Sequence, residues 1–309
     1  MFVCRDAAAL PAALRGGAVA IGNFDGLHPG HCAVIDAARR AAAPARAPLG
    51  VLTFEPHPRR LFRPDAPAFR LTPPRAKLAL LRDAGVDFVI VQRFNRAFAS
   101  QSAEAFVQRL LRHGLGVSHV AVGSDFCYGQ GRSGDRATLA ASGASDGFGV
   151  HIVPPALDAL GAPFASTRIR EALAEGEMER ATTLLGRPFS ISGFVRRGDQ
   201  RGRLLGFPTA NVALGPYFRP RFGVYAVRCR IGGRGFGGVA NLGERPTVGG
   251  TQARLEVHLF DCDQDLYGQR LESALTHFIR PERRFDGLEA LRDQIQRDAA
   301  VARDVLGAA

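Results

Sequence analysis

The sequence predicts an α/β fold in two domains: a parallel sheet with helices on both faces, then a small antiparallel β-barrel with a C-terminal helix. Two observations along the 309 residues indicate this. Short apolar runs alternate with longer helix-like stretches from residue 18 to about residue 185. After Gly186-Arg187-Pro188 the apolar segments become short and alternating, with glycine and proline between them. We therefore place the domains at residues 1–185 and 186–309.

The first domain is expected to be Rossmann-like. Strand-helix alternation implies a parallel sheet covered by helices on both faces. Ligands of such sheets bind at the carboxyl ends of the strands, so the loops that follow the strands are candidate sites. The candidate strands are residues 18–21, 49–54, 88–91, 119–122 and 150–153, and the candidate helices are residues 30–43, 74–84, 102–113 and 135–145.

The second domain has the pattern of an antiparallel sheet or small barrel. Its candidate strands are residues 189–195, 224–231, 236–241, 255–260 and 270–278. The chain then closes with a helix from about Gly287, because Leu288, Leu291 and Ile295 recur at helical spacing.

The composition is that of an ordinary globular protein, with 46% hydrophobic and 22% charged residues. No apolar stretch approaches the roughly 20 residues that span a bilayer, and the N-terminus lacks the layout of a secretory signal. The five cysteines are scattered without a C-x-x-C pair, which argues against a zinc or redox centre. These features predict a cytoplasmic protein with no membrane partner. The net charge of +11 favours polyanionic partners without separating nucleic acid from small phosphates.

The most informative segment follows the first strand, where Gly22-Asn23-Phe24-Asp25-Gly26 leads to His28-Pro29-Gly30-His31. A glycine-rich turn before a helix aims backbone N–H groups and the positive end of the helix dipole at its ligand. His28 and His31 add donors that can follow charge as it develops on a phosphate. The segment therefore predicts a nucleotide phosphate site. The alternative is a pair of histidines that cap local carbonyls or face solvent.

Two more strand ends carry candidate ligand contacts. After the second strand, Phe54 offers a flat apolar face and His57 a polar edge, in a loop stiffened by Pro56 and Pro58. This loop suits an aromatic or phosphorylated acceptor; the alternative is a rigid turn with Phe54 in the core. After the fourth strand, the glycines of Gly123-Ser124-Asp125-Phe126-Cys127-Tyr128-Gly129 permit close backbone approach to a ligand, or form an ordinary surface loop.

The segment Ser166-Thr167-Arg168-Ile169-Arg170 opens a helix after the fifth strand. Serine or threonine at a helix start usually caps the helix. The arginines directly behind would hold a departing pyrophosphate by charge-assisted hydrogen bonds. Together with the histidines, this segment predicts nucleotidyl transfer. Catalysis would rest on positioning and electrostatics, because the sequence shows no sign of a covalent nucleophile.

The second domain has a separate set of candidate residues. Gly198, Gly202 and Gly206 lead into Phe207-Pro208-Thr209-Ala210-Asn211. In an extended segment Thr209 and Asn211 project to one face and present hard oxygen ligands for Mg²⁺ on ATP phosphates; the alternative is a polar turn after proline. Glu256 points away from its aliphatic neighbours, and it either faces water or accepts the proton of an attacking hydroxyl.

Taken together, these segments make the chain similar to the bacterial bifunctional riboflavin kinase/FMN adenylyltransferases, the prokaryotic FAD synthetases. The resemblance covers nearly the whole chain, in order, across both domains. Its segments are residues 22–31, 53–58, 123–129 and 166–170 in the first domain, and residues 206–211, 223–225, 241–247, 255–258, 265–268 and 280–282 in the second.

The resemblance implies two reactions in one chain. The barrel domain would transfer the γ-phosphate of ATP to the ribityl 5′-hydroxyl of riboflavin, with Thr209 and Asn211 holding Mg²⁺ and ATP and Glu256 as base. The first domain would join FMN to AMP from a second ATP, which gives FAD and pyrophosphate. There His28 and His31 would steady the α-phosphate, and Thr167 and Arg170 the β- and γ-phosphates.

Further contacts implied by the resemblance fall into two groups. The flavin contacts are Phe54, Pro56, His57, Pro58 and Phe126. The ATP contacts are the 22–26 turn, Gly123, Asp125, Ser166, Gly198, Gly202 and Gly206. The expected partners are the small molecules riboflavin, FMN and ATP, without nucleic acid, in a monomer or weak homo-oligomer.

Two positions depart from the family pattern. The family usually has two serines before the threonine of the helix-start motif, and Ala165 replaces the first. An arginine is common where Cys127 stands. One alternative is therefore a single-activity riboflavin kinase with an impaired adenylyltransferase site. An RNA-binding protein is a further alternative, although the arginines gather around phosphate-type motifs rather than in a stripe.

Overall fold

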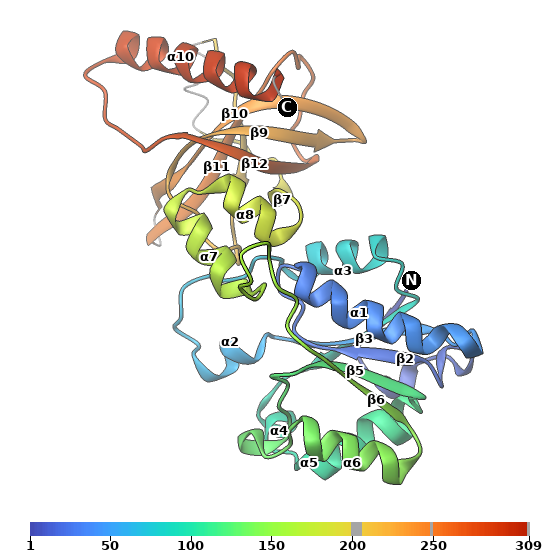
Figure 1. Cartoon of the computed structure of the whole chain (residues 1–309). Coiled ribbons are helices and arrows are strands. Elements are labelled where there is room, and N and C mark those ends of the chain that lie inside the picture. The colour runs from blue at the N-terminus through green and yellow to red at the C-terminus, as the bar shows by residue number, and fades with distance from the viewer. Residues whose placement is uncertain (199–205, 248–249, 308–309) are drawn as a thin grey trace. The chain divides into compact units, whose positions relative to one another are not determined.

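The computed structural model describes residues 1–198, 206–247 and 250–307. The chain forms two compact units (Figure 1). The first contains Met1–Pro67 and Thr72–Ala165, and the second contains Ala68–Leu71 and Ser166–Ala309.

The first unit is built on a six-stranded parallel sheet with the strand order β1-β4-β3-β2-β5-β6. Its strands are β1 (Phe2–Cys4), β2 (Ala18–Ile21), β3 (Leu49–Glu55), β4 (Phe88–Arg93), β5 (His119–Gly123) and β6 (Gly149–Val153). The prediction of a parallel sheet is confirmed.

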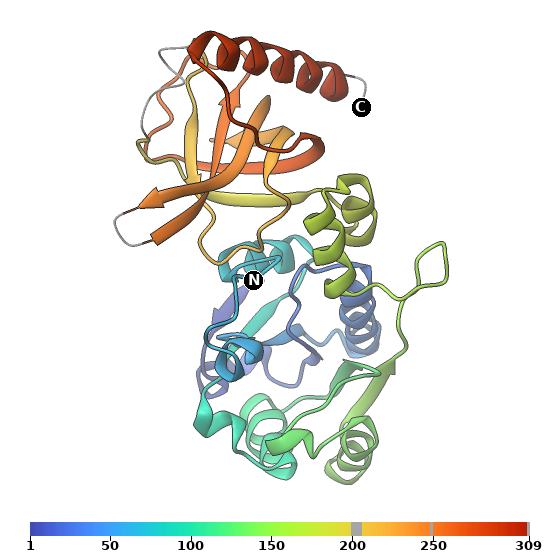
Figure 2. The same ribbon diagram turned by 90° about the vertical axis from the view of Figure 1, so that its left-hand side faces the viewer.

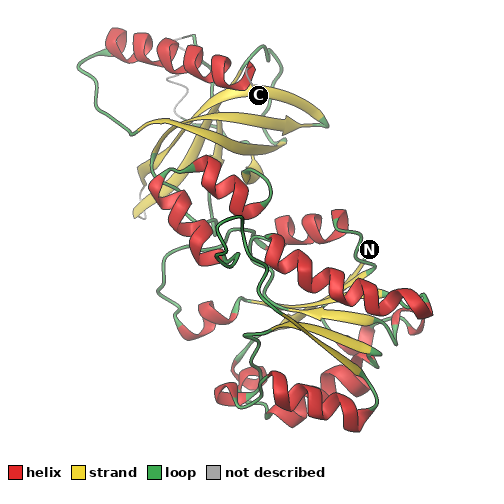
Figure 3. Cartoon of the chain, in the orientation of Figure 1, coloured by secondary structure: helices red, strands yellow, loops and turns green. Residues whose placement is uncertain are grey.

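Helices cover both faces of this sheet (Figure 3). The α-helices are α1 (Pro29–Ala42), α2 (Pro58–Phe62), α3 (Pro74–Asp83), α4 (Arg96–Ala99), α5 (Ala103–Ala105) and α6 (Arg136–Asp146), and η4 (Phe106–Leu115) is a π-helix. Short 3-10 turns are η1 (Ala7–Ala9), η2 (Ala12–Leu14), η3 (Ala43–Ala45) and η5 (Gln130–Arg132). Helices α1 and α3 pack on one face, and η4 and α6 pack on the other.

The apolar run of β2 shows why these strands read as continuous apolar segments. Side chains alternate across a strand, so a strand covered on both faces needs apolar residues at every position. Ala18 and Ala20 pack in the core beside α1, and Val19 and Ile21 pack in the core beside η4. All four residues are buried, which places the end of β2 and its turn at a fixed point of the sheet.

The second unit contains a six-stranded antiparallel sheet with the order β7-β12-β9-β10-β11-β8. Its strands are β7 (Phe189–Phe194), β8 (Ala210–Ala213), β9 (Gly223–Ile231), β10 (Arg234–Thr247), β11 (Gly250–Leu259) and β12 (Arg270–Arg280). The sheet curves into a barrel (Figure 2), and a backbone hydrogen bond from Arg196 N to Asn211 O, 2.9 Å long, links its two ends. Helices α7 (Ser166–Glu175) and α8 (Met178–Leu185) precede the barrel.

The C-terminal helix α10 (Leu288–Gly307) packs on the barrel through Ala299, Ala302 and Leu306. These residues contact buried residues of the barrel strands, Val224 and Val239 among them. The predicted C-terminal helix is therefore confirmed, and its apolar stripe faces the barrel. None of the described helices combines the length and apolarity needed to cross a bilayer.

Most predicted elements are present in the structure. Strands β10 and β11 extend beyond the predicted ranges 236–241 and 255–260, and β8 was not among the candidate strands. The three-residue strand β1 was not predicted, because so short an edge strand carries no periodicity. The helix predicted over residues 102–113 is instead α5 followed by the π-helix η4, which extends to Leu115 before Gly116 in the left-handed conformation. The boundary between the compact units lies between Ala165 and Ser166. The assignment of residues 166–185 to the first domain stays a prediction.

Candidate functional sites

The turn after β2 is shaped by unusual backbone conformations. Phe24, Gly26 and Leu27 have φ values of 49°, 97° and 42°, in the left-handed region that non-glycine residues seldom adopt. The ring of Phe24 is buried beneath the turn, so packing holds this conformation. Helix α1 begins at Pro29, with His28 as its N-cap residue. The first turn of α1 therefore presents its backbone N–H groups at this strand end, as predicted.

A second set of contacts fixes the turn from outside the motif. Thr72 N donates to Asp25 Oδ1 at 2.9 Å, and Gly26 N donates to Thr72 Oγ1 at 2.8 Å. Asp25 and Thr72 are both buried. These hydrogen bonds give the Asp25 carboxylate a role in shaping the turn; its contact with phosphate stays a prediction.

The two histidines lie against each other. Their rings stack with centroids 3.7 Å apart and an interplanar angle of 21°. His28 is 5% exposed and His31 is half-buried, with the edge of the Phe24 ring 5.4 Å from His31. A Cβ at Gly30 would lie 3.1 Å from the His28 ring, so glycine leaves room for the stack. The structure thus brings together the two imidazoles that the sequence predicted to act together.

One residue beside this turn was missed by the sequence reasoning. The side chain of Lys77 in α3 is 1% exposed, and its Nζ lies 3.0 Å from the carbonyl oxygen of Asn23. The signal was present, because Lys77 stands one helical turn before the buried Leu81 on the apolar face of the predicted helix. A lysine at an apolar position of a helix is either buried together with hydrogen-bond partners or shows that the predicted buried face of the helix is wrong.

The loop after β3 places Phe54 in the core, one of the two alternatives that the sequence left open, and the flavin contacts predicted for this loop stay predictions. Phe54 is 8% exposed and packs in the core against Phe94 and Phe98, at centroid distances of 5.9 and 6.0 Å. His57 Nδ1 accepts a hydrogen bond from Arg59 N at 3.1 Å and caps α2. Phe54 therefore offers a flavin little surface, as the core-packing alternative requires. The aromatic ring exposed on this segment is Phe62, at 67%.

The loop after β5 contains an aromatic stack. The rings of Phe126 and Tyr128 lie 5.6 Å apart and nearly parallel, at 15°. Burial raises the pKa of Tyr128, so its phenol stays protonated. The phenol oxygen lies 3.4 Å from Thr138 Oγ1. Phe126, a predicted flavin contact, is half-buried, and Asp125, a predicted ATP contact, is exposed. Both contacts stay predictions.

The helix-start motif opens α7, which belongs to the second unit. Thr167 is exposed, and Ser166 is half-buried. Arg170 Nε donates to the carbonyl of Phe69 at 2.8 Å, and the guanidinium lies 5.8 Å from the centre of the Phe69 ring. The convergence of Thr167 and Arg170 with the histidines stays a prediction.

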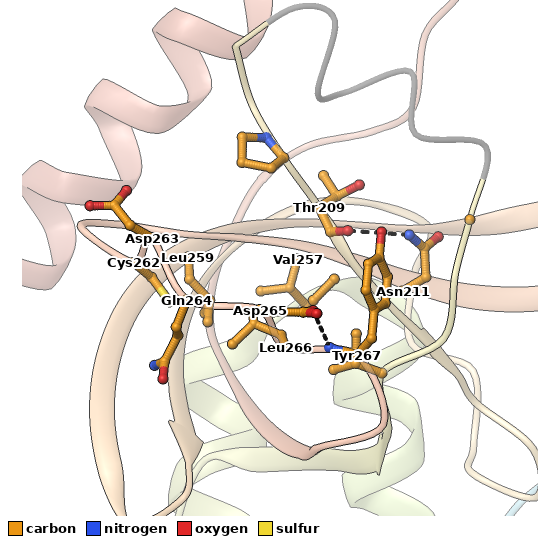
Figure 4. A pocket seen from close by; sticks show the side chains of 14 residues that line it. Thr209, Asn211, Val257, Leu259, Cys262, Asp263, Gln264, Asp265, Leu266 and Tyr267 are labelled. Carbon is orange, nitrogen blue, oxygen red and sulfur yellow. Dashed lines mark hydrogen bonds between the residues drawn. The ribbon is translucent and has the colours of Figure 1, made fainter.

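The second unit has a cavity of about 450 Å³ beside β8 and β11 (Figure 4). Predicted site residues in its wall are Gly198, Thr209 and Asn211. The rest of the wall consists of Val195, Pro208, Ala210, Val257, Leu259, Cys262, Asp263, Gln264, Asp265, Leu266 and Tyr267. The wall thus combines apolar and aromatic side chains with hydroxyl, amide and carboxylate groups. Mixed apolar and polar linings of this kind are typical of small-molecule sites.

The loop that carries Tyr267 is held on both sides. Tyr267 N donates to Asp265 Oδ1 at 2.9 Å (Figure 4). The guanidinium of Arg197 lies 5.5 Å from the centre of the Tyr267 ring, within the range of a cation–π contact. Neither Tyr267 nor Arg197 was predicted as a site residue.

Glu256 lies in a row of polar residues across three strands. In the β-ladder it stands opposite Asn211 on one side and Asn241 on the other. Side chains of directly opposite residues lie on the same face, with Cβ atoms about 5 Å apart. The strand pairing therefore brings the predicted base beside the predicted metal ligand, although Glu256 itself does not line the cavity wall.

An arginine that the sequence did not single out joins this row. Arg254 Nη1 donates to Asn211 Oδ1 at 3.3 Å, and Asn211 Nδ2 donates to Thr209 O at 3.4 Å. Asn211 is 6% exposed, so its amide is oriented by two partners in a buried position. Among the predicted glycines, Gly198 lies against the Asn211 amide and Gly206 is exposed at φ 84°, whereas Gly202 lies outside the described residues.

The structure has stacked histidines at a helix start on a parallel sheet and a cavity beside a polar row in a barrel, the two-domain arrangement predicted for a nucleotide-dependent transferase. Family profiles divide the chain in the same way: the FAD synthetase profile matches residues 10–168, and the riboflavin kinase profile matches residues 185–306. The chain belongs to the family of bifunctional riboflavin kinase/FMN adenylyltransferases.

Individual relatives agree over most of the chain. The bifunctional riboflavin kinase/FMN adenylyltransferase of Escherichia coli (strain K12) is 43% identical over 294 residues, which are 95% of this chain and 94% of that protein. That of Bacillus subtilis (strain 168) is 38% identical over 285 residues, 91% and 89% of the two chains. A crystal structure of a macrolide-efflux protein from Streptococcus pneumoniae is 30% identical, with a TM-score of 0.86 over 98% of both chains. The fold of this chain is therefore similar to that of the solved structure over nearly its whole length.

Proposed function

We propose that the barrel unit phosphorylates riboflavin at the row formed by Asn211 and Glu256, and that the parallel-sheet unit adenylylates FMN at the stacked histidines. Riboflavin is converted to FMN, and FMN to FAD, with ATP as the co-substrate of both steps. The observation that carries the assignment of the first step is the register pair Asn211–Glu256 beside the cavity. For the second step it is the histidine stack at the start of α1.

In the kinase step Glu256 acts as general base. Its carboxylate accepts the proton of the ribityl hydroxyl as the hydroxyl oxygen attacks the γ-phosphorus of ATP. The new oxygen–phosphorus bond gives FMN, and the bond to the β-phosphate oxygen breaks to release ADP. ATP occupies the cavity with its base against Tyr267 and the aliphatic wall and its phosphates toward Thr209.

The oxygen donors in this site fit Mg²⁺ that arrives with ATP. Thr209 and Asn211 supply a hydroxyl and an amide oxygen, and both are neutral. Mg²⁺ prefers oxygen ligands and commonly shares them with substrate phosphates, which here bring the negative charge. Asn211 Oδ1 has two lone pairs, so it can accept from Arg254 and still ligate. Thr209 and Asn211 would hold the ion, and bound Mg²⁺ would neutralise charge on the transferring phosphoryl group.

In the adenylyl-transfer step the phosphate oxygen of FMN attacks the α-phosphorus of ATP in line, and pyrophosphate leaves. His28 and His31 donate hydrogen bonds to the α-phosphate oxygens as their negative charge grows. The N–H groups at the start of α1 act on the same charge. Ser166, Thr167 and Arg170 hold the leaving pyrophosphate, and Gly123 and Asp125 border the nucleotide.

The flavin of FMN rests on the exposed ring of Phe62 and on the half-buried ring of Phe126. An isoalloxazine gains most from an aromatic face that is open to it, and Phe62 is 67% exposed whereas Phe54 is 8% exposed. Phe54 supports this surface from the core, through the ring of Phe94 that contacts both. Pro56, His57 and Pro58 form the rim of the same loop.

The activities divide at residues 1–185 for adenylyl transfer and 186–309 for phosphorylation. The protein is cytoplasmic, acts on small molecules without a nucleic-acid partner, and is a monomer or weak homo-oligomer. Affinity for RNA that falls steeply with salt would instead support the RNA-binding alternative.

The decisive experiment separates the products by chromatography after the protein is incubated with riboflavin, ATP and Mg²⁺. We expect riboflavin to pass through FMN to FAD. Accumulation of FMN without FAD would support the single-activity alternative and implicate Ala165 or Cys127. Absence of any conversion would contradict both assignments.

A further inference from the structure

We propose that Lys77 is a positioning residue for adenylyl transfer. Its buried ammonium holds two segments at a fixed separation: the turn after β2 (residues 22–27), called the phosphate turn, and the loop after β3 (residues 55–58), called the flavin loop. The inference rests on the function proposed above for the first unit. Lys77 itself contacts no substrate in this proposal and acts through the backbone and side chains that it binds.

Three oxygen atoms surround the ammonium. Lys77 Nζ donates to Asn23 O and to Thr53 Oγ1, each at 3.0 Å, and lies 3.1 Å from Glu55 Oε1. The Lys77 side chain is 1% exposed and that of Glu55 is 17% exposed. Thr53 Oγ1 also donates to Asn23 O at 3.2 Å. A single cation therefore joins the turn after β2 to the end of β3.

Both joined segments carry proposed site residues. Asn23 immediately precedes Phe24, whose left-handed backbone starts the turn that leads to His28. Glu55 immediately precedes Pro56, in the loop that leads to α2 and Phe62. Since the reacting phosphates and the flavin must meet at a set distance, a contact that fixes the spacing of these two segments also fixes the geometry of attack.

The side-chain oxygen of Asn23 gives the turn no comparable support. This Oδ1 atom is buried and has no hydrogen-bond partner among the residues that the structure describes. The carbonyl of Asn23, held by Lys77 and Thr53, is therefore the anchor of this part of the turn.

The sequence singles out the same residue. Lys77 is the only lysine among the 40 lysine and arginine residues of the chain. An ammonium is compact and donates in three directions, whereas a guanidinium is planar and wider. The acceptors come from three different residues around a side chain that is 1% exposed, so we expect the compact ammonium to fit this space better than a guanidinium.

The test compares Lys77→Met and Lys77→Arg with the exposed control Arg75→Met in the full-length enzyme. We expect Lys77→Met to lower kcat for FAD formation from FMN and ATP at least tenfold, while KM for each substrate changes less than threefold. Lys77→Arg retains the charge and is expected to lose less. Riboflavin phosphorylation by the same chain is expected to stay within twofold in all variants, and Arg75→Met is expected to leave both reactions within twofold.

Several outcomes would overturn the inference. Normal FAD formation by Lys77→Met contradicts it, and so does a loss confined to KM. A parallel loss of riboflavin phosphorylation indicates general misfolding and also contradicts it. If the wild-type protein makes no FAD, the proposed function fails rather than the role of Lys77.

A second measurement uses the unchanged protein and does not depend on whether the variants fold. Because the chain has one lysine, lysine-selective ¹⁵N labelling gives a single side-chain ammonium signal. We expect this signal to shift when FMN and a non-hydrolysable ATP analogue bind together, since the two segments around it tighten. An unchanged signal under saturating ligands would count against the inference.

Discussion

The two proposed sites differ in how the fold holds their residues. In the first unit, His28 and Asp25 are buried, and the turn between them is fixed by contacts from Thr72 and Lys77, about 50 residues further along the chain. In the second unit, Asn211, Glu256 and Asn241 are aligned by strand register, beside a cavity of about 450 Å³. One site depends on a strained turn with distant supports, and the other on the regular geometry of a sheet.

This difference has a consequence for substitutions. A strand row tolerates the loss of one side chain, because the backbone pairing that places its neighbours remains. A turn with left-handed residues depends on every contact that holds it. Substitutions of reacting groups should therefore affect one reaction in either unit, whereas substitutions of supporting groups should matter more in the first.

The largest effect is expected for Glu256→Ala. Loss of the base should lower kcat for riboflavin phosphorylation about 10²–10⁴-fold. FAD formation from supplied FMN should remain, because adenylyl transfer is assigned to the histidines of the first unit, which Glu256 does not belong to. The measurement is the rate of FMN and FAD formation in separate assays. Glu272, exposed on β12, provides the matched control Glu272→Ala, and an equal loss in both variants would remove the assignment.

The next largest effect is expected for His31→Ala. Removing one donor to the α-phosphate should lower kcat for FAD formation about 10²–10³-fold and leave riboflavin phosphorylation unchanged. Steady-state rates with FMN and ATP measure this effect. His113→Ala changes an exposed histidine of the same unit and should leave both rates intact. If both reactions fall together in His31→Ala, the two-site description is wrong.

A smaller effect is expected for Arg254→Ala. The Asn211 amide would lose the donor at its oxygen, and a hydrogen bond of this kind contributes on the order of 1.4 kcal/mol, or about tenfold. The increase should appear in KM for ATP at limiting Mg²⁺ more than in kcat. Arg254→Lys should recover part of the loss, whereas Arg230→Ala, at an exposed position of β9, should have no effect. An unchanged KM in Arg254→Ala would show that strand register alone orients Asn211.

The smallest effect is expected for Phe62→Ala. Loss of one aromatic contact of about 0.5–1.5 kcal/mol should raise KM for FMN roughly two- to tenfold in FAD formation. Phe54→Ala, in contrast, removes a core side chain and should lower the stability of the first unit by about 3–5 kcal/mol, which urea unfolding measures. A raised KM for FMN in Phe54→Ala, together with an unchanged KM in Phe62→Ala, would show that Phe54 contacts the flavin.

How far each site could be predicted from the sequence depends on whether its residues are close together along the chain. His28 and His31 were predicted as a pair because both stand where the glycine-rich turn meets the start of a helix. Thr209 and Asn211 were predicted together because alternate residues of an extended segment share a face. Thr72 and Arg254 were not predicted as site residues, because contacts across the chain leave no periodic signal. The helical pattern marks Lys77 as a lysine on an apolar face, but it does not show which residues its ammonium contacts. The exposure of Phe62 and the burial of Phe54 were likewise undetermined, since both lie in an apolar and aromatic segment.

The sequence by itself determined the class of each sheet, the strands that carry the motifs, and the family to which the chain belongs. These follow from local properties: apolar periodicity, glycine and proline positions, and short motifs at strand ends. Only the tertiary structure decided that Lys77 lies under the phosphate turn, that Arg254 holds the Asn211 amide, and that Phe54 is buried while Phe62 is exposed. The physical reason is that burial and long-range hydrogen bonding depend on which distant segments pack together, and no local pattern encodes that choice.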